Sequence, residues 1–268
     1  MTILDQPLTP TRLGGLAVRK VHELEFSFNM MVYGDWGVGK TYLSGQADDV
    51  PEMRKVLFVD CEAGTLSLRD FPSIDVVRVT TWDELRQVLE ELKVGKHPYQ
   101  TVVLDSLTEI QKFNVEQIME DLVREKPDRD RDITGLQEWN KSASQIRRFV
   151  RAYRDLPMNT IFTALVRIDR DKMNRPIKMP ALSGKLAMEI PGFFDYVFYY
   201  SKEDIDGVPT RIMQTDRTSD IAAKSRIGKK YTLPLKIGNP SMQQLYGLIK
   251  NSEPDHDLAS TKSLVPKG

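Results

Sequence analysis

The stretch MVYGDWGVGKTYLSG, residues 31–45, constrains the fold of this chain more than any other segment. It contains the spacing G-x-x-x-x-G-K-[ST], which is typical of a phosphate-binding P-loop. Its glycines permit backbone conformations that turn amide N–H groups toward phosphate oxygens, and the following helix presents the positive end of its dipole. Such a loop must lie between a strand and a helix. The preceding segment is apolar and alternating, as in a strand, and residues 40–50 can form a helix that stops at Pro51.

This motif predicts a nucleotide site in which Lys40 contacts the β- and γ-phosphates and Thr41 offers a hydroxyl to Mg²⁺. The alternative is a glycine-rich turn that matches the pattern by chance. The flanking strand and helix favour the nucleotide site. The residues predicted to bind ATP are Gly34, Asp35, Trp36, Gly37, Val38, Gly39, Lys40, Thr41 and Tyr42.

A P-loop protein that hydrolyses its nucleotide needs an acidic residue after a second core strand, to hold Mg²⁺. The segment TVVLDS, residues 101–106, ends in Asp105, which we predict to be this residue. Hydrolysis also needs a group that deprotonates the attacking water. Many ATPases carry a glutamate directly after the metal aspartate, but here the next residue is Ser106.

The strand-like segment VLFVDCE, residues 56–62, offers Asp60 and Glu62 at its end. In an α/β sheet the carboxyl ends of the strands face the ligand. We therefore predict Glu62 as the catalytic base, acting together with Lys40. The alternative is that Glu62 only caps or solvates the end of a strand.

The order of segments along the chain predicts the architecture. Strand-like and helix-like segments alternate from Leu24 to about Gly192, which indicates parallel strands joined by helices. After Phe193 the segments FFDYVFYY and TRIMQTD indicate antiparallel strands at a sheet edge. We expect an α/β fold with a mostly parallel central sheet flanked by helices, built from an arm (residues 1–23), an ATPase domain (24–250) and a disordered tail (251–268).

Composition excludes several functions. Lys plus Arg and Asp plus Glu both total 38 in 268 residues, so contact with nucleic acid must come from local patches. One cysteine and three histidines leave neither a disulfide framework nor zinc-ligand spacing. The sequence has neither a stretch of 18 apolar residues nor the pattern of a signal peptide, so we expect a cytoplasmic protein without membrane partners.

Together, the motifs resemble the RecA-type recombinase core. More closely, YGDWGVGKT, FVDCEAG, VVLDSLTEI, WNKSASQIRRFVRAYRDLP and AAKSRIG resemble the phage-encoded, core-only RecA-like ATPases of the Sak single-strand annealing group. This resemblance implies assembly into a ring or filament, binding of single-stranded DNA, and a place in the cytoplasm of a bacterial host. A single-strand DNA-binding protein is a further candidate partner.

The resemblance has one departure. RecA-type proteins often end their fourth core strand with a glutamine that senses the γ-phosphate, whereas IFTALVR places Ala164 and Leu165 there. Thr163 and Arg167 are the alternatives for this role.

The resemblance also implies that two loops face DNA. Residues 124–135 are balanced in charge, so a solvated loop is an equal alternative there. Residues 167–185 form a long segment with a surplus of cations and no aromatic residue, which indicates contact with DNA phosphates rather than base stacking. Its candidate DNA-binding residues are Arg167, Arg170, Lys172, Arg175, Lys178 and Lys185.

Two further groups of cations remain. Related ATPases supply cations to a neighbouring subunit's nucleotide from the region of DRTSDIAAKSRIGKK, where the candidates are Lys224 and Arg226, then Arg217. The alternative for these three is an exposed basic hairpin. On the predicted helix QIRRFVRAYRD, the face with Arg147, Arg151 and Arg154 is a solvated surface, a subunit contact or an approach for DNA.

The sequence thus predicts a Mg²⁺-dependent ATPase that binds single-stranded DNA and promotes annealing or homologous recombination. A nucleotide-switched loader or regulatory module that acts on a replication protein is the alternative. A small-molecule phosphotransferase is disfavoured, because no arginine-rich lid helix or acceptor pocket is evident.

Overall fold

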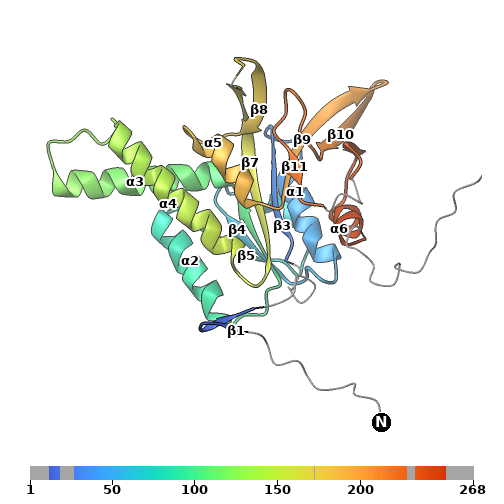
Figure 1. Cartoon of the computed structure of the whole chain (residues 1–268), viewed down its shortest axis with the longest axis horizontal. Coiled ribbons are helices and arrows are strands. Elements are labelled where there is room, and N and C mark those ends of the chain that lie inside the picture. The colour runs from blue at the N-terminus through green and yellow to red at the C-terminus, as the bar shows by residue number, and fades with distance from the viewer. Residues whose placement is uncertain (1–11, 19–26, 172, 228–232, 252–268) are drawn as a thin grey trace, which may run out of the picture.

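The computed structural model describes residues 12–18, 27–171, 173–227 and 233–251. A ten-stranded sheet forms the centre of the molecule, and helices cover both of its faces (Figure 1). Along its main path the strands follow the order β12-β10-β9-β3-β7-β6-β4-β5, and β8 and β11 pair with β7 and β9. The expected α/β fold with a central sheet is therefore confirmed.

The parallel part of the sheet contains the strands that the sequence predicts. Most of these segments are buried on both faces, as their nearly continuous apolar sequences require. The pairs β3/β7, β6/β7, β4/β6 and β4/β5 all run parallel. The strands are β3 (Asn29–Gly34), β4 (Val56–Asp60), β5 (Asp75–Arg78), β6 (Thr101–Asp105) and β7 (Asn159–Arg170).

The C-terminal part of the sheet is antiparallel, which confirms the second expectation. β9 (Tyr196–Ile205) runs parallel to β3 but pairs antiparallel with β10 (Val208–Gln214), and β10 pairs antiparallel with β12 (Lys236–Gly238). The short β11 (Lys224–Ser225) pairs with the start of β9.

The expectation of a long loop over residues 167–185 is wrong. β7 continues to Arg170 and pairs antiparallel with β8 (Pro176–Pro180), so most of this segment is a β-hairpin. The alternation of polar and apolar residues from Val166 to Arg170 has the period of a strand, but the charges obscure it.

Two hydrophobic cores lie on opposite faces of the sheet. Along β3, Met31 and Tyr33 point to the first core, and Met30 and Val32 point to the second. The first core lies beneath α2 (Trp82–Val94), α3 (Leu107–Glu125), α4 (Leu136–Arg154) and α5 (Leu186–Glu189). The second lies beneath α1 (Lys40–Gly45) and α6 (Met242–Lys250). Three short 3₁₀ helices, η2 (Gln46–Asp49), η3 (Thr65–Leu68) and η4 (Ile190–Phe193), complete the layers.

Local sequence signals explain where the helices start. Thr81 caps α2 in a capping box with Glu84, and Ser106 caps α3 by accepting a hydrogen bond from the Glu109 N–H. The helix expected over residues 40–50 is shorter than predicted, because α1 ends at Gly45 and continues as η2.

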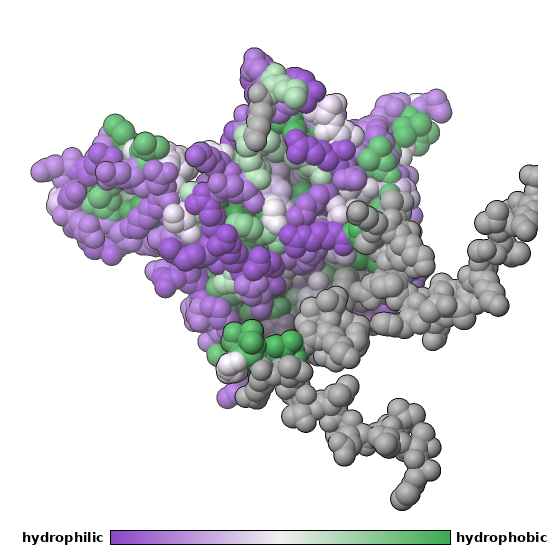
Figure 2. All heavy atoms as spheres, in the orientation of Figure 1, coloured by the Kyte–Doolittle hydropathy of each residue, from purple (hydrophilic) through white to green (hydrophobic). Residues whose placement is uncertain are grey.

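Most of the molecular face in Figure 2 is polar. One green cluster lies at the hairpin of β1 (Arg12–Leu13) and β2 (Leu16–Ala17), where Leu13 and Leu16 are exposed (Figure 2). In the part of the chain that the structure describes, no helix has the length and apolar character needed to span a bilayer.

The strand order places β3 between two longer strands. β7 pairs with β3 up to Leu165, opposite Gly34, and then continues to Arg170. On the other side, β9 pairs with β3 up to Tyr199 and continues to Ile205. The hairpins β7–β8 and β9–β10 therefore extend past the end of β3 on both sides (Figure 1).

Gly34 is the last residue of β3, and a substitution there can test how closely β3 packs against β9. A Cβ atom built on Gly34 would lie 1.9 Å from the carbonyl oxygen of Tyr200 on β9. We predict that Gly34→Ala lowers the free energy of unfolding by about 1–3 kcal/mol, because β3 and β9 must separate. Urea unfolding measures this loss. The control Gly247→Ala adds a methyl group with no atom within 4 Å, in α6. It should instead stabilise the helix by about 0.5–1 kcal/mol; equal effects of the two changes would contradict the packing argument.

Candidate active site

The P-loop follows β3 directly and leads into α1. Gly37 and Gly39 have φ angles of 71° and 102°, in the region that favours glycine. Gly39 is the residue that precedes the first turn of α1. The two glycines therefore permit the turn that carries the chain from the sheet into the helix.

Lys40 lies in the centre of this loop. It is only 8% exposed, and its Nζ donates to the carbonyl oxygens of Gly34 (3.0 Å) and Asp35 (2.8 Å). Burial lowers the pKa of the ammonium group, and the carboxylates of Asp105 and Glu62 act in the opposite direction. The cation is thus enclosed by the loop and attracted by both predicted catalytic carboxylates.

Asp105 ends β6 and meets Thr41, the second residue of α1. Thr41 Oγ1 donates to Asp105 Oδ2 at 2.6 Å, and Thr163 on β7 donates to Asp105 Oδ1. The pKa of this carboxyl is raised mainly by burial, while the hydrogen bonds from Thr163 and Thr41 lower it. A hydroxyl and a carboxylate are the oxygen donors that Mg²⁺ takes from proteins, so these two residues fit the ion.

No group of three or more His, Cys, Asp or Glu side chains forms a potential metal site in the described parts of the chain. A cation held by Thr41 and Asp105 would therefore need phosphate and water oxygens to complete its shell. Mg²⁺ is commonly bound in this way, through one or two protein groups and the phosphates of a nucleotide.

Glu62 lies in the turn after β4, next to Asp105. The strands β4 and β6 are neighbours, and Asp60 pairs with Asp105 in the register. Asp60 shapes the turn, because its Oδ1 accepts from the backbone N–H groups of Glu62 (3.1 Å) and Gly64 (3.2 Å). The Glu62 side chain accepts a hydrogen bond from Ser106 Oγ. Lys40, Thr41, Glu62 and Asp105 are therefore brought together at the carboxyl ends of β3, β4 and β6.

The two residues considered as γ-phosphate sensors have other partners in this structure. Thr163 donates to Asp105, so it acts on the predicted metal ligand. Arg167 donates to the carbonyl oxygen of Leu182 (2.6 Å) and pairs with Asp169.

A cavity of about 440 Å³ adjoins the start of α1. Arg211 on β10 lies at its wall, and its Nε donates to the carbonyl oxygen of Val38 in the P-loop at 2.9 Å. The cavity is lined by Gly39, Tyr42, Leu43, Gln46, Tyr200, Arg211, Asn239 and Pro240. No sequence motif predicts a role for Arg211, because a lone arginine in a strand carries no such signal. Trp36, by contrast, points out of the loop and is 86% exposed.

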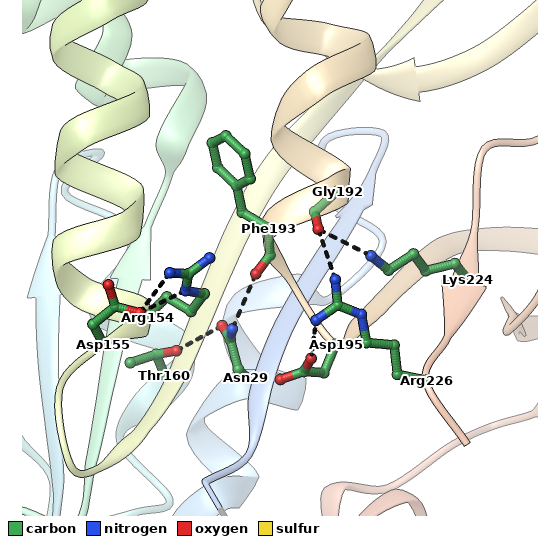
Figure 3. A network of polar contacts seen from close by, with 9 residues as sticks. All are labelled: Asn29, Arg154, Asp155, Thr160, Gly192, Phe193, Asp195, Lys224 and Arg226. Atoms are coloured by element: carbon green, nitrogen blue, oxygen red, sulfur yellow. Dashed lines mark hydrogen bonds and ion pairs between the residues drawn. The ribbon is translucent and has the colours of Figure 1, made fainter. Parts of the chain in front are cut away.

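Lys224 and Arg226, which were considered as cations for a neighbouring subunit's nucleotide, lie away from this chain's own P-loop. Figure 3 shows Lys224 and Arg226 beside the start of β3, near Asn29. Arg226 pairs with Asp195 (2.8 Å), and both cations donate to the carbonyl oxygen of Gly192. The register places Lys224 level with Met31 and Arg226 near Asn29, so both lie toward the start of β3, whereas the P-loop follows its end. Within their own chain their hydrogen bonds are to Gly192 and Asp195, and not to the P-loop.

Several cations of the β7–β8 hairpin are engaged within the chain. Arg175 pairs with Asp171 (2.7 Å), Arg167 pairs with Asp169, and Lys178 Nζ lies 5.0 Å from the centre of the Tyr199 ring. Arg170 donates to the carbonyl oxygen of Asn174. Lys172 lies outside the described residues. The net attraction of this hairpin for an anion is therefore weaker than its count of cations indicates.

On α4, the predicted arginine face also contacts neighbouring parts of the chain. Arg147 pairs with Glu189 (2.6 Å), and Arg151 lies over the ring of Phe193. Arg154 pairs with the adjacent Asp155.

Comparison with known proteins identifies the class of this domain. A family model described as an AAA domain matches residues 27–227, which is most of the chain. The chain belongs to this AAA domain family of P-loop ATPases. No curated protein matches the chain.

Two solved structures show similarity. The flagellar accessory protein FlaH from Methanocaldococcus jannaschii is 10% identical, with a TM-score of 0.45 over 78% of this chain and 83% of that one. A KaiC-like protein from Pyrococcus horikoshii OT3 is 15% identical, with a TM-score of 0.40 over 71% of this chain and 78% of that one.

The buried carboxylate of Asp105 leads to a prediction about stability. Its pKa lies above the ordinary aspartate value, so the folded protein binds this proton more tightly than the unfolded chain does. The stability of the ligand-free protein should therefore rise as pH falls through this raised pKa toward the ordinary aspartate value. We predict that Asp105→Asn stabilises the ligand-free protein at neutral pH and removes this part of its pH dependence.

The same change should weaken Mg²⁺·ATP binding by about tenfold or more, because a metal ligand is lost. Urea unfolding at several pH values and calorimetric titration measure the two effects. A variant that is less stable than the wild type at neutral pH would show that burial does not dominate at Asp105.

Proposed function

We propose that this chain is a Mg²⁺-dependent, RecA-like ATPase that uses ATP to control the handling of single-stranded DNA. The observation that carries the ATPase part is the convergence of Lys40, Thr41, Asp105 and Glu62 at one edge of the sheet. The AAA domain match supports nucleotide binding and hydrolysis.

Each residue has a specific task in this proposal. Lys40 leaves the carbonyl oxygens of Gly34 and Asp35 and donates to the β- and γ-phosphates. Thr41 and Asp105 hold the metal, and Mg²⁺ supplies charge neutralisation at the phosphate oxygens. Glu62 accepts a proton from the water that attacks the γ-phosphate.

The cavity beside α1 is the best place for the nucleoside. It adjoins Gly39 and offers the Tyr42 ring, and it carries the side chains of Gln46 and Asn239 for polar contacts. Arg211 would lie between the nucleoside and the loop, because it lines this cavity and donates to Val38.

The proposal extends to assembly into a ring or filament. A ring or filament would bring Lys224 and Arg226 of one subunit to the nucleotide of the next; within their own chain they contact Gly192 and Asp195 and not the P-loop. A cation that approaches in this way stabilises charge on the transferred phosphate.

The ATPase chemistry can be tested with two variants. Lys40→Ala should weaken Mg²⁺·ATP binding by about tenfold to a hundredfold, because a charge-assisted contact is lost. Glu62→Gln should leave binding intact and lower hydrolysis by about 10²- to 10⁴-fold, because the proton acceptor is removed. Nucleotide titration and phosphate-release kinetics separate the two effects. Normal turnover by Glu62→Gln would show that another group is the base.

The proposed binding of single-stranded DNA can be tested by substitutions in the β7–β8 hairpin. Neutralising Arg170, Lys172, Arg175 and Lys178 should weaken binding of single-stranded DNA and reduce the slope of log K against log salt by up to about four. Fluorescence anisotropy with an oligonucleotide measures both quantities, with and without ATP, alongside an annealing assay. A control that neutralises Arg86 and Lys93 on α2 should leave binding unchanged. Unchanged binding by the hairpin variant would place the DNA site elsewhere.

One observation favours the second candidate, a nucleotide-switched loader or regulatory module. Arg167 and Arg175 are paired with acidic neighbours on the same hairpin. Such pairing reduces the attraction to phosphates and fits docking to a protein surface. ATP-dependent binding to a replication protein without binding to DNA would support this candidate.

A further inference from the structure

Ser106 occupies the position directly after Asp105. It is 1% exposed and begins α3 as the N-cap. Its Oγ accepts from the Glu109 N–H at 3.4 Å and donates its own proton to Glu62 Oε1. One buried hydroxyl thus connects the start of α3 to the carboxylate proposed as the base.

Glu62 needs such a partner, because its side chain is exposed on a turn. Asp60 fixes the backbone of this turn by accepting from the N–H groups of Glu62 and Gly64. These bonds leave the side-chain torsions of Glu62 undetermined. The bond from Ser106 is the side-chain hydrogen bond that directs the carboxylate toward the end of β6.

Two cations lie close enough to Glu62 to attract its carboxylate. Lys40 and Lys112 both interact electrostatically with Glu62, and Lys112 is already paired with Glu109 at 2.7 Å. If Glu62 moved to pair with Lys40, the proposed phosphate ligand and the proposed base would neutralise each other. A neutral hydroxyl donor holds Glu62 without adding a charge and leaves its second oxygen available to water.

We propose that Ser106 is a positioning residue that holds Glu62 in the geometry for proton abstraction. This inference rests on the proposed ATPase function with Glu62 as the base. The residue that stands where many ATPases carry the glutamate thus orients a glutamate from the neighbouring strand β4.

The test measures Mg²⁺·ATP binding and single-turnover hydrolysis in a double-mutant cycle. Ser106→Ala should lower the hydrolysis rate by about tenfold to a hundredfold, since a base displaced by about 1 Å loses this much. The dissociation constant for Mg²⁺·ATP should stay within about twofold of the wild type. In the Glu62→Gln background the same change should have no further effect, because Ser106 acts through Glu62.

Three further variants separate positioning from helix capping. Ser106→Gly removes the hydroxyl but keeps most of the capping stability, so it should be as slow as Ser106→Ala and still fold. Ser106→Thr retains the hydroxyl and should restore most of the rate. As a control, Thr81→Ala removes the N-cap of α2, which corresponds to Ser106 at α3 but lies away from the site. It should lower thermal stability without changing hydrolysis.

The outcomes distinguish this inference from the proposed function. A wild-type protein that binds ATP but does not hydrolyse it overturns both. Hydrolysis that is lost in Glu62→Gln but normal in Ser106→Gly overturns the role of Ser106 alone. A full additional loss from Ser106→Ala in the Glu62→Gln background also overturns it, because the hydroxyl then acts independently of Glu62.

Discussion

The hydrogen bond from Thr41 to Asp105 joins parts of the molecule that are far apart in sequence. Thr41 belongs to the helix that follows β3, and Asp105 ends β6, with β7 between these strands. Thr163 of β7 donates to the other oxygen of the same carboxylate. Three neighbouring strands therefore meet at one buried group, and the position of the P-loop helix depends on it. This contact therefore helps to fix the P-loop helix relative to the strand ends that carry Asp105 and Glu62.

A second contact links the P-loop strand to the regions proposed for DNA and for a neighbouring subunit. The hydroxyl of Tyr33, one residue before Gly34, lies 2.7 Å from the carbonyl oxygen of Ala222 and 3.1 Å from that of Lys178. Burial raises the pKa of this phenol, so it remains a neutral donor. Lys178 and Ala222 are also hydrogen-bonded to each other through their backbones. A shift of β3 would therefore reach both β8 and the segment before β11.

The sequence predicted the parts of this structure that depend on local chemistry. The glycines of the P-loop and the buried runs that end at Asp60 and Asp105 each carry a local signal. The sequence did not show that residues 167–185 form a hairpin, because charges obscure the strand period from Val166 to Arg170 and no local pattern reveals the pairing of β7 with β8. It also missed Arg211, whose contact with Val38 joins positions 173 residues apart. Contacts of this kind depend on the order of strands in the sheet, which single-sequence patterns do not determine.

The buried charges of Lys40 and Asp105 fit the proposed binding of a nucleotide with a cation. Lys40 is enclosed by the loop, and burial disfavours its charged form, while Asp105 is desolvated as well. The two carbonyl oxygens that Lys40 contacts accept from two of its three N–H donors but carry only partial charge. Phosphate oxygens carry more negative charge, so their exchange for these carbonyls strengthens the hydrogen bonds of Lys40. A cation between Asp105 and the same phosphates would offset the desolvation of the carboxylate. Under the proposed function, an anionic nucleotide and a cation would therefore favour each other's binding, because either ligand alone would leave one buried charge unbalanced.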